Sequence, residues 1–481
     1  MKTRLLISAL CLSLFLAPPV LAAEFQDGID AIKRGDYETA LKALKPHLKQ
    51  GHAEAQYNLG VMFDNGLGVP QSYEKALNWY TLAAEQGDRN AQSNLGALYE
   101  EGLGTQKDHA AALKWYTRAA EQGAASAQYN LALFYYKATT IPRNFRLAAK
   151  WYTLAAEQGE VNAQNNLGQM LDHGVGLAQN FEQAFKWYGF AAQQGDAAAQ
   201  YNLAVLHKDG LGTLQDYKTA FHWFNKSSAQ GFVDAQINLA RLYKNGLGTE
   251  QNDQATIYWY SLAANKGSGE AQYNLGLIYK NGISVPQNLN KAAHWFKLAA
   301  ELGESGAQQN LGLMYKNGIG VPQDDEMTAY WYEKAAEQGI ASAQYDLALM
   351  YSNGIGIEQS YSQSVRWMSA AAKGGLGDAQ YNLASLYKNG LSVERDEKTA
   401  LYWYHRAAAQ GNVSAQFNLG LMFYKGQGGE QNITGAYVWW SLAAKQGHVG
   451  AENNLDVAKK EVPAQELATA DTFIETWTSK P

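Results

Sequence analysis

The stretch "AQYNLGVMFDNGLGVPQSYEKALNWYTLAAEQG" runs from Ala55 to Gly87, and its reappearance decides how the whole chain is organised. Its opening letters return with 36 residues between starts and without a slip. The copies begin at Ala91, Ala127, Ala163, Ala199, Ala235, Ala271, Ala307, Ala343, Ala379, Ala415 and Ala451. A chain of 481 residues would ordinarily hold about three globular domains, but a fixed period predicts one repeat array without separate cores.

The first third of each unit has the spacing of a short helix. Counted from the first alanine, so that Ala55 is position 1, positions 1, 5 and 8 are apolar and position 9 is usually tyrosine. Such residues share one face of a helix. Positions 12 and 14 are mostly glycine, as in Gly66 and Gly68, and glycine permits the left-handed backbone that ends a helix.

A second helix is predicted to begin after position 18, which is Ser, Asp or Asn in every full unit, because these residues cap helix N-termini. They are Ser72, Asp108, Asn144, Asn180, Asp216, Asn252, Asn288, Asp324, Ser360, Asp396 and Asn432. Small residues then recur at positions 22, 29 and 30, an aromatic residue at 26, and glycine at 33. Eleven of the thirteen tryptophans occupy position 25, from Trp79 to Trp439, and we expect them to be core residues between layers.

Each unit therefore reads helix, turn, helix, turn, and stacked units share a continuous core because one pair of short helices buries too little surface alone. The pattern Ala-x-x-x-Leu-Gly-x-x-Tyr, Gly-x-Gly, cap, Lys-Ala-x-x-Trp-Tyr, Ala-Ala, Gly resembles the Sel-one-like repeat family, a branch of the tetratricopeptide-like helical repeats. The resemblance implies an all-α fold, a right-handed α-solenoid whose first helices line a concave surface. It also implies a scaffold or adaptor, the typical role of members of the family. Many bacterial members are exported and work in the envelope or in contact with host cells.

Four segments are predicted along the chain. Residues 1–23 resemble a secretory signal peptide, with Lys2 and Arg4 before an apolar run and small residues at the cleavage site. Residues 24–54 are predicted to be an N-terminal tetratricopeptide-like capping unit, and 55–450 to be eleven repeats. Residues 451–481 are predicted to be a partial repeat and a capping helix, whose Leu467, Phe473 and Trp477 would cover the open core.

Cysteine and charge narrow the classes of function. The one cysteine, Cys11, lies in the predicted signal peptide, so the mature chain would contain no thiol and no disulfide. Loss of Lys2 and Arg4 leaves 37 basic against 45 acidic residues, which argues against nucleic-acid binding. No later stretch approaches the length of a membrane span. We expect an exported protein, periplasmic or secreted, without stable membrane insertion.

No pattern for catalysis, a metal or a cofactor stands out. Metalloprotease, phosphate-binding and nucleophile-elbow motifs do not occur. His222 and His294 share position 24, and we expect them to be solvated helix residues and not metal ligands. The sequence predicts a non-enzymatic interaction protein. The alternative is an enzyme or enzyme modulator acting on the cell wall or an antibiotic, a role linked to the family.

Candidate binding residues come from the first helix, where positions 3, 7 and 10 point away from a core centred on position 5. Position 10 is acidic in early units, and from the fifth unit to the tenth it is a row of lysines that is broken once, at Ser352. These are Lys208, Lys244, Lys280, Lys316 and Lys388, and the tyrosines at position 3 beside them are Tyr201, Tyr273, Tyr345 and Tyr381. The hypothesis is a strip that grips a protein or peptide, in particular an acidic extended segment. Alternatively, lysine near a helix C-terminus only favours the helix dipole.

Two further features leave alternatives open. Position 4 is Asn in all copies but one, which has Asp346, and it could hold a partner's backbone or form a ladder of hydrogen bonds to a neighbouring turn. The ladder is the preferred interpretation, and Gln at position 2 is interpreted in the same way. The third unit has Lys137-Ala138-Thr139-Thr140 in place of its turn glycines, either as a neutral variation or as a bend or binding loop.

Overall fold

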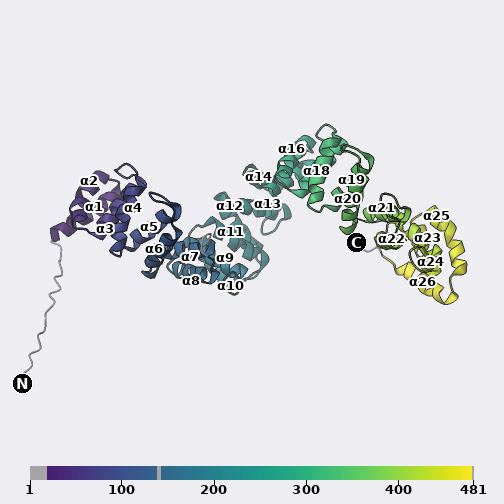
Figure 1. Ribbon diagram of the computed structural model, residues 1–481, viewed down its shortest axis with the longest axis horizontal. Helices are drawn as coiled ribbons and strands as arrows, with labels where there is room; N and C mark the ends of the chain where they lie inside the picture. Colours follow the sequence, from purple (N-terminus) through teal and green to yellow (C-terminus); the bar gives the residue numbers. More distant parts are fainter. Residues whose placement is uncertain (1–18, 138–141, 479–481) are drawn as a thin grey trace, which may run out of the picture. The chain divides into compact units, whose positions relative to one another are not determined.

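The computed structural model describes residues 19–137 and 142–478, and within these ranges every regular element is an α-helix (Figure 1). Two helices precede the repeats, α1 (Pro19–Arg34) and α2 (Tyr37–Lys49), the latter capped by Asp36. Most of the predicted signal peptide and the unusual turn of the third unit lie outside these residues. In the part of the chain that is described, no helix combines the length and apolarity needed to span a bilayer.

Each repeat contributes two helices of 13 residues. The first helices are α3 (Ala53–Asn65), α5 (Arg89–Glu101), α7 (Ala125–Lys137), α9 (Val161–His173), α11 (Ala197–Asp209), α13 (Val233–Asn245), α15 (Gly269–Asn281), α17 (Ser305–Asn317), α19 (Ala341–Asn353), α21 (Gly377–Asn389) and α23 (Val413–Lys425). The second helices are α4 (Tyr73–Glu85), α6 (His109–Glu121), α8 (Phe145–Glu157), α10 (Phe181–Gln193), α12 (Tyr217–Ala229), α14 (Asp253–Asn265), α16 (Leu289–Glu301), α18 (Asp325–Glu337), α20 (Tyr361–Lys373), α22 (Glu397–Ala409) and α24 (Ile433–Lys445). The chain ends with α25 (Val449–Glu461) and α26 (Ala464–Thr476).

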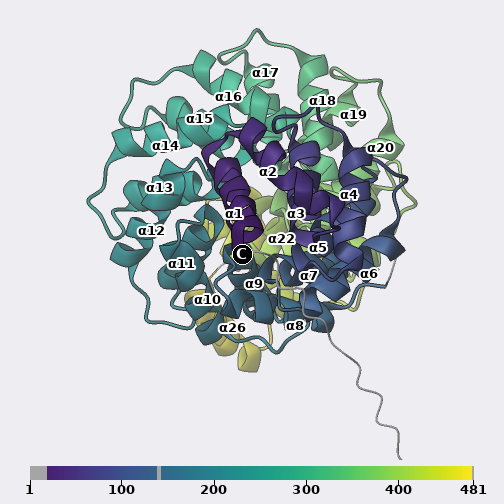
Figure 2. The same ribbon diagram turned by 90° about the vertical axis from the view of Figure 1, so that its left-hand side faces the viewer.

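The fold is an all-α solenoid built of these stacked pairs. Contacts divide the chain into two compact parts, the N-terminal part and the C-terminal part. The N-terminal part is Met1–Ala235 with Leu247–Thr249, and the C-terminal part is Gln236–Gly246 with Glu250–Pro481. Inside each part, a second helix packs between its own first helix and the next one along the chain. Figure 2 shows the helices α14 to α20 of the C-terminal part following one another along an arc, so that each pair is rotated relative to the pair before it.

Local capping explains where the helices begin and end. All eleven residues predicted at position 18 are N-caps whose side-chain oxygen accepts a backbone N–H two or three residues later. The first helices of the repeats, other than α7, end at a glycine in the left-handed conformation, for example Gly66 with φ 70°. The predicted helix boundaries are therefore confirmed by the bonds that set them.

Position 14 needs glycine for a second reason, the close approach of two units. A Cβ on Gly104 would lie 2.4 Å from the carbonyl carbon of Tyr73 in the preceding unit. Ser284 and Ser392 replace this glycine, and both adopt positive φ, 56° and 63°. Their left-handed backbone is strained for a residue with a side chain. The hydroxyl of Ser284 bonds to Asp253 of the preceding unit, whereas the tolerance of Ser392 has no such explanation in the structure.

The aromatic core lies one residue beyond the tryptophan column. Position 26 is fully buried in unit after unit, as at Tyr80, Phe224 and Phe296. Four of the position-25 tryptophans are buried, namely Trp115, Trp331, Trp367 and Trp439, and the other seven are half-buried. The interpretation of tryptophan as a filler between layers is confirmed, because Trp115 packs into the cluster of the preceding unit.

The C-terminal helix α26 covers part of the last core. Ala470 and Ile474 are buried, and Leu467 and Trp477 pack against the same cluster. Phe473 was predicted to join them, but its side chain is 47% exposed. Residues spaced four apart on one helix share a face, and Ile474 occupies the inward position, so its neighbour Phe473 is turned outward.

Glutamine at position 2 forms a buried hydrogen-bond ladder between units. Its Nε2 donates to the carbonyl of position 30 in the preceding unit, as from Gln92 to Ala84 at 3.0 Å. Its Oε1 accepts from the glutamine at position 32 of its own unit, as from Gln122 to Gln92 at 2.8 Å. The same pair of bonds recurs at Gln128, Gln164, Gln200, Gln308, Gln380 and Gln416. The structural interpretation of this column is confirmed.

The ladder is interrupted in the seventh repeat, and this interruption predicts a stabilising substitution. In the seventh repeat position 32 is Leu302, which is 58% exposed, and the buried Oε1 of Gln272 has no hydrogen-bond partner among the described residues. Leu302→Gln should supply the missing donor and stabilise the fold by about 1 kcal/mol. Thermal unfolding of the full chain followed by circular dichroism measures the shift. Leu302→Ala, which removes the exposed leucine without adding a donor, is the control, and equal melting temperatures for the two variants would refute the prediction.

The buried tyrosines at position 26 predict a loss of stability at alkaline pH. Burial raises the pKa of Tyr260 and of Tyr404 to about 12, and it also raises the pKa of Tyr80, Tyr116 and Tyr188. Unfolded tyrosine releases its proton near pH 10, so the unfolded state gains stability from that pH upward and the fold loses it.

Tyr404→Phe should therefore reduce the fall in melting temperature between pH 8 and pH 11. Phenylalanine fits this place in other repeats, as at Phe224 and Phe296, so the variant is expected to fold. Tyr402→Phe, at an exposed ring on the same helix, should keep the wild-type fall. An identical fall in both variants would contradict the prediction.

Candidate functional site

The lysines at position 10 reach across from one first helix to the next. Nζ of Lys280 on α15 donates to Oδ1 of Asn310 on α17 at 2.7 Å, and Nζ of Lys388 on α21 donates to Oδ1 of Asn418 on α23 at 3.0 Å. Both acceptors occupy position 4 of the following repeat. A lysine at position 10 is therefore held in place by position 4 of the next repeat. The row is an ordered feature of the first helices in the C-terminal part of the chain.

The asparagine acceptors are themselves fixed. Nδ2 of Asn310 donates to the carbonyl of Gly306 at 2.8 Å, and Nδ2 of Asn418 donates to that of Ser414 at 2.9 Å. The amide oxygen is thus turned toward the lysine. An ammonium group has three N–H donors, and one asparagine oxygen takes one of them. Because the asparagine is neutral, this contact positions the lysine without cancelling its charge.

Lys316 differs from these two lysines. Its Nζ lies 3.1 Å from Oδ1 of Asp346, the one aspartate in the position-4 column, and the two side chains form an ion pair. The positive charge in the middle of the row is therefore compensated by the protein. Burial, followed by the charge of Lys425, lowers the pKa of Lys388 from its ordinary value. The row has cations held at Lys280 and Lys388 and a self-paired cation between them.

The remaining two lysines have other surroundings. Lys244 on α13 is exposed and belongs to the C-terminal part. Lys208 on α11, in the N-terminal part, is half-buried, and its Nζ lies 3.2 Å from Oδ1 of Asp209. Lys280, Lys316 and Lys388 thus each contact position 4 of the next repeat, whereas Lys208 has a neighbouring acidic partner on its own helix.

The acidic residues at position 10 of the early units bond to the core tyrosine of their own unit. The hydroxyl of Tyr80 donates to Asp64 at 3.0 Å, and that of Tyr116 donates to Glu100 at 2.9 Å. The hydroxyl of Tyr188 donates to Asp172 at 3.3 Å. The acidic residues at position 10 therefore have hydrogen-bond partners inside the protein. Neither the ligand-binding nor the helix-dipole interpretation of position 10 predicts this.

The tyrosines at position 3 are less accessible than the helical spacing predicts. Tyr273 packs on Phe296 with ring centroids 5.9 Å apart, and Tyr381 packs on Tyr404 at 5.7 Å. Tyr201 lies 5.8 Å from Phe224 in the same way. These rings and Tyr345 are half-buried, because the next first helix covers position 3. These rings are therefore only partly open to solvent.

Position 4 does not bond to a neighbouring turn, so that part of the prediction is wrong. Its amide donates to its own helix, as from Asn58 to the carbonyl of Glu54, or to a tyrosine of the preceding unit, as from Asn94 to Tyr80. Nδ2 of Asn382 donates to the hydroxyl of Tyr345 at 3.0 Å. One-dimensional periodicity places position 4 at the edge of the core but does not show that the preceding first helix is its neighbour.

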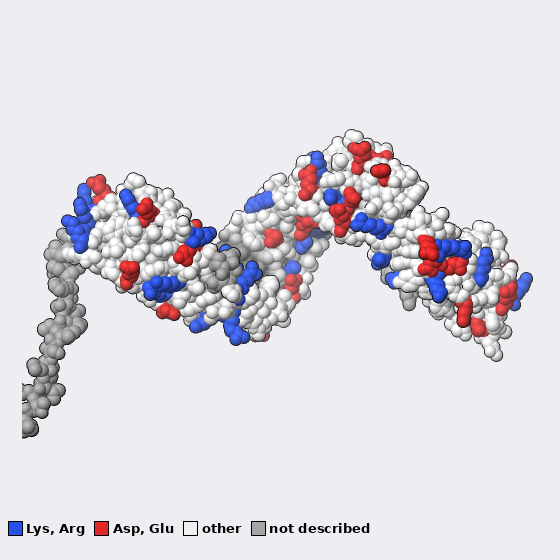
Figure 3. All heavy atoms as spheres, in the orientation of Figure 1, with Lys and Arg blue, Asp and Glu red and all other residues white. Residues whose placement is uncertain are grey.

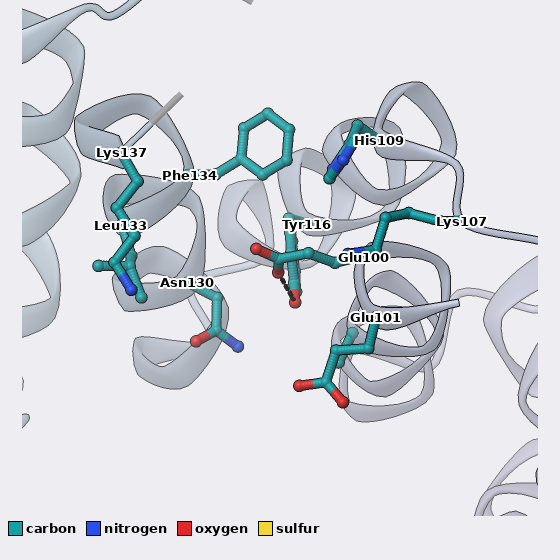
Figure 4. Close-up of a pocket in the computed structure, with 10 residues that line it drawn as sticks. Glu100, Glu101, Lys107, His109, Tyr116, Asn130, Leu133, Phe134 and Lys137 are labelled. Atoms are coloured by element: carbon teal, nitrogen blue, oxygen red, sulfur yellow. Dashed lines mark hydrogen bonds between the residues drawn. The ribbon is translucent and has the colours of Figure 1, made fainter. Parts of the chain in front are cut away.

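Two pockets open at equivalent places between successive repeats. Each is lined by positions 10, 11, 17 and 19 of one repeat and by positions 4, 7 and 8 of the next. The pocket between the second and third repeats has a volume of about 490 Å³ and is bordered by Glu100, Glu101 and Phe134, as Figure 4 shows. The pocket between the seventh and eighth repeats has a volume of about 290 Å³ and is bordered by Lys280 and Leu313. The two pockets share their architecture and differ in charge.

Within residues 19–137 and 142–478, no group of three or more His, Cys, Asp or Glu side chains is placed to hold a metal ion. His222 and His294 are exposed, as predicted, and each ring packs edge-on against the adjacent tryptophan. On the face drawn in Figure 3, acidic and basic side chains are interspersed among a mostly uncharged surface.

Comparison with known proteins identifies the class. Eleven consecutive segments match the Sel1 repeat, the Sel-one-like repeat of the first section, at residues 53–88, 89–123, 125–160, 161–196, 197–232, 233–268, 269–304, 305–340, 341–376, 377–412 and 413–448. The chain therefore belongs to the Sel1 repeat family. Proteins of this family are generally scaffolds for protein interaction. No curated protein matches the chain in sequence.

Two solved structures with Sel1-type repeats are similar to this chain. One is c5321, a protective antigen of uropathogenic Escherichia coli, with 32% identity and a TM-score of 0.71 over 91% of this chain and 95% of that chain. The other is a Sel1 repeat protein from Oxalobacter formigenes, with 29% identity and a TM-score of 0.52 over 68% of this chain and 93% of that chain.

Proposed function

We propose that this protein is a non-enzymatic scaffold that is exported to the periplasm or the exterior. It binds an acidic extended partner segment along the lysine row on the first helices of its C-terminal part. The observation that carries the proposal is the pair of contacts from Lys280 to Asn310 and from Lys388 to Asn418. A cation that is already held in position loses little side-chain entropy on binding. Its two remaining N–H groups can donate to carboxylates of a partner.

The dimensions of the row suit an extended chain. Adjacent packed helices lie about 8–10 Å apart. Lys280 and Lys388 are three repeats apart, so an extended segment of about eight residues would connect them. A protein that is acidic overall presents two held cations here, three repeats apart on first helices, which favours an extended ligand of opposite charge.

The similarity to c5321 supports export. A protective antigen is met by the immune system of a host, so a location outside the cytoplasm is consistent with that similarity and with the predicted signal peptide. Membership of a family of interaction scaffolds supports the absence of turnover.

Charge reversal in the row is expected to abolish binding of an acidic probe. The probe is a fluorescent peptide of about twelve residues with alternating Glu and Gly, and fluorescence anisotropy measures its affinity for the full chain. Lys280→Glu with Lys388→Glu should weaken binding by at least about tenfold, because each charge-assisted hydrogen bond contributes about 1.5–3 kcal/mol.

Lys297→Glu with Lys398→Glu is the matched control, with the same change of net charge at exposed lysines on second helices. It should bind the peptide as the wild type does. Equal weakening in both double variants would mean that only net charge matters, and an absence of binding to the wild type would refute an acidic partner.

Asp346→Asn is expected to strengthen binding of the same peptide. The substitution restores the asparagine found at position 4 in the other repeats and removes the carboxylate that pairs with Lys316. An exposed ion pair contributes up to about 1 kcal/mol, so the gain should be about fivefold. The gain should fall as salt concentration rises. Unchanged or weaker binding would show that Lys316 does not face the ligand.

A further inference from the structure

The pocket beside Lys280 contains apolar surface that the lysine row alone does not explain. Its walls are Leu289 at the start of α16 and Leu313, Met314 and Ile319 of the next repeat. Leu313 is 40% exposed and Ile319 is 38% exposed, whereas Met314 is buried. Lys280, Asn310 and Gln287 lie at its polar edge, and no carboxylate lines it.

From this arrangement we infer that the pocket takes an apolar side chain, of the size of leucine, that stands next to a carboxylate in the bound segment. The inference rests on the proposed function and deepens it, since it identifies one anchoring residue of the acidic partner. A volume of about 290 Å³ has room for one leucine side chain and lies just below the range of about 300–1,000 Å³ that is usual for small-molecule pockets. Buried apolar anchors beside charged contacts are typical of the central residues of protein interfaces.

Position 19 forms one wall of the pocket at this junction. In several repeats this position is aromatic, and the ring of Phe145 lies 5.4 Å from the ring of Tyr136 at position 10 of the same repeat. An aromatic ring at position 19 thus occupies the space beside position 10. The seventh repeat has Leu289 there, and the second repeat, which forms the other pocket, has His109. Leucine and histidine are both smaller than the phenylalanine or tyrosine that several other repeats have at position 19.

The polar edge fixes which neighbour the anchor must have. Nε2 of Gln287 donates to the backbone carbonyl of Lys280 at 2.7 Å and closes the end of α15 over the pocket. The ammonium of Lys280 bonds to Asn310 at 2.7 Å, which places its remaining donors at the rim. A carboxylate beside the anchoring side chain would therefore meet a cation, whereas a basic neighbour would be repelled.

A pair of fluorescent peptides tests the inference with the full chain. One is the alternating Glu and Gly peptide, and the other has leucine in place of its central glycine. The wild type should bind the leucine peptide about tenfold more tightly. Leu289→Phe should abolish this preference and leave the affinity for the glycine peptide unchanged. Leu82→Phe, at an exposed leucine of the first unit, should keep the preference.

The outcomes separate the inference from the proposed function. Equal binding of both peptides to the wild type, or an equal loss of both in Leu289→Phe, would overturn the pocket and leave the acidic partner standing. No binding of either peptide would overturn both. A second readout does not depend on any variant: the methyl resonance of Met314 in the NMR spectrum should shift with the leucine peptide and not with the glycine peptide. An unshifted resonance would also overturn the inference.

Discussion

The stack depends on the buried glutamine at position 2 of each repeat. In most repeats its amide donates to the end of the preceding second helix and accepts from the end of its own, so one side chain connects three helices. A buried amide that lost either partner would be costly, since burial of an unpaired polar group costs about 1–3 kcal/mol. The relation between units is therefore fixed by hydrogen-bond geometry as well as by apolar packing. A repeat of different length would break both bonds, which accounts for a 36-residue period without a slip.

Sequence patterns predict best where a residue acts within its own helix. The caps at position 18 and the glycines at position 12 satisfy backbone groups next to them, so their roles follow from residue type and spacing. Which of positions 25 and 26 is the more deeply buried is harder to predict, because the two residues are adjacent and both are usually aromatic. Tyr80 is buried and Trp79 is half-buried, since the former points between the two helices of its unit and the latter toward the preceding unit. Helical periodicity alone does not supply this difference of a fraction of a turn.

The candidate site could be predicted only in part, for a related reason. Residue type marked position 10 as unusual, and the lysines do form an ordered row. The partners of that row lie on the next repeat, and no periodicity within one helix shows that Lys280 meets Asn310 or that Lys316 meets Asp346. The same gap led position 3 to be interpreted as open, although the following first helix covers it. Contacts between units must come from the three-dimensional stack, because the sequence separation of 30 residues carries no local signal.

Division of labour within the repeat explains how such a surface can vary. Positions 1, 2, 5, 22, 26, 29 and 30 hold the backbone in place, so changes at positions 4, 10 and 19 leave the stack intact. An acid at position 10 can bond to a core tyrosine, and a lysine at the same place can reach the next repeat. A leucine at position 19 forms a wall of the apolar pocket in the seventh repeat. Charge and cavity are thus adjustable one repeat at a time, and the most distinctive junction, between the seventh and eighth repeats, combines a held cation with an apolar pocket.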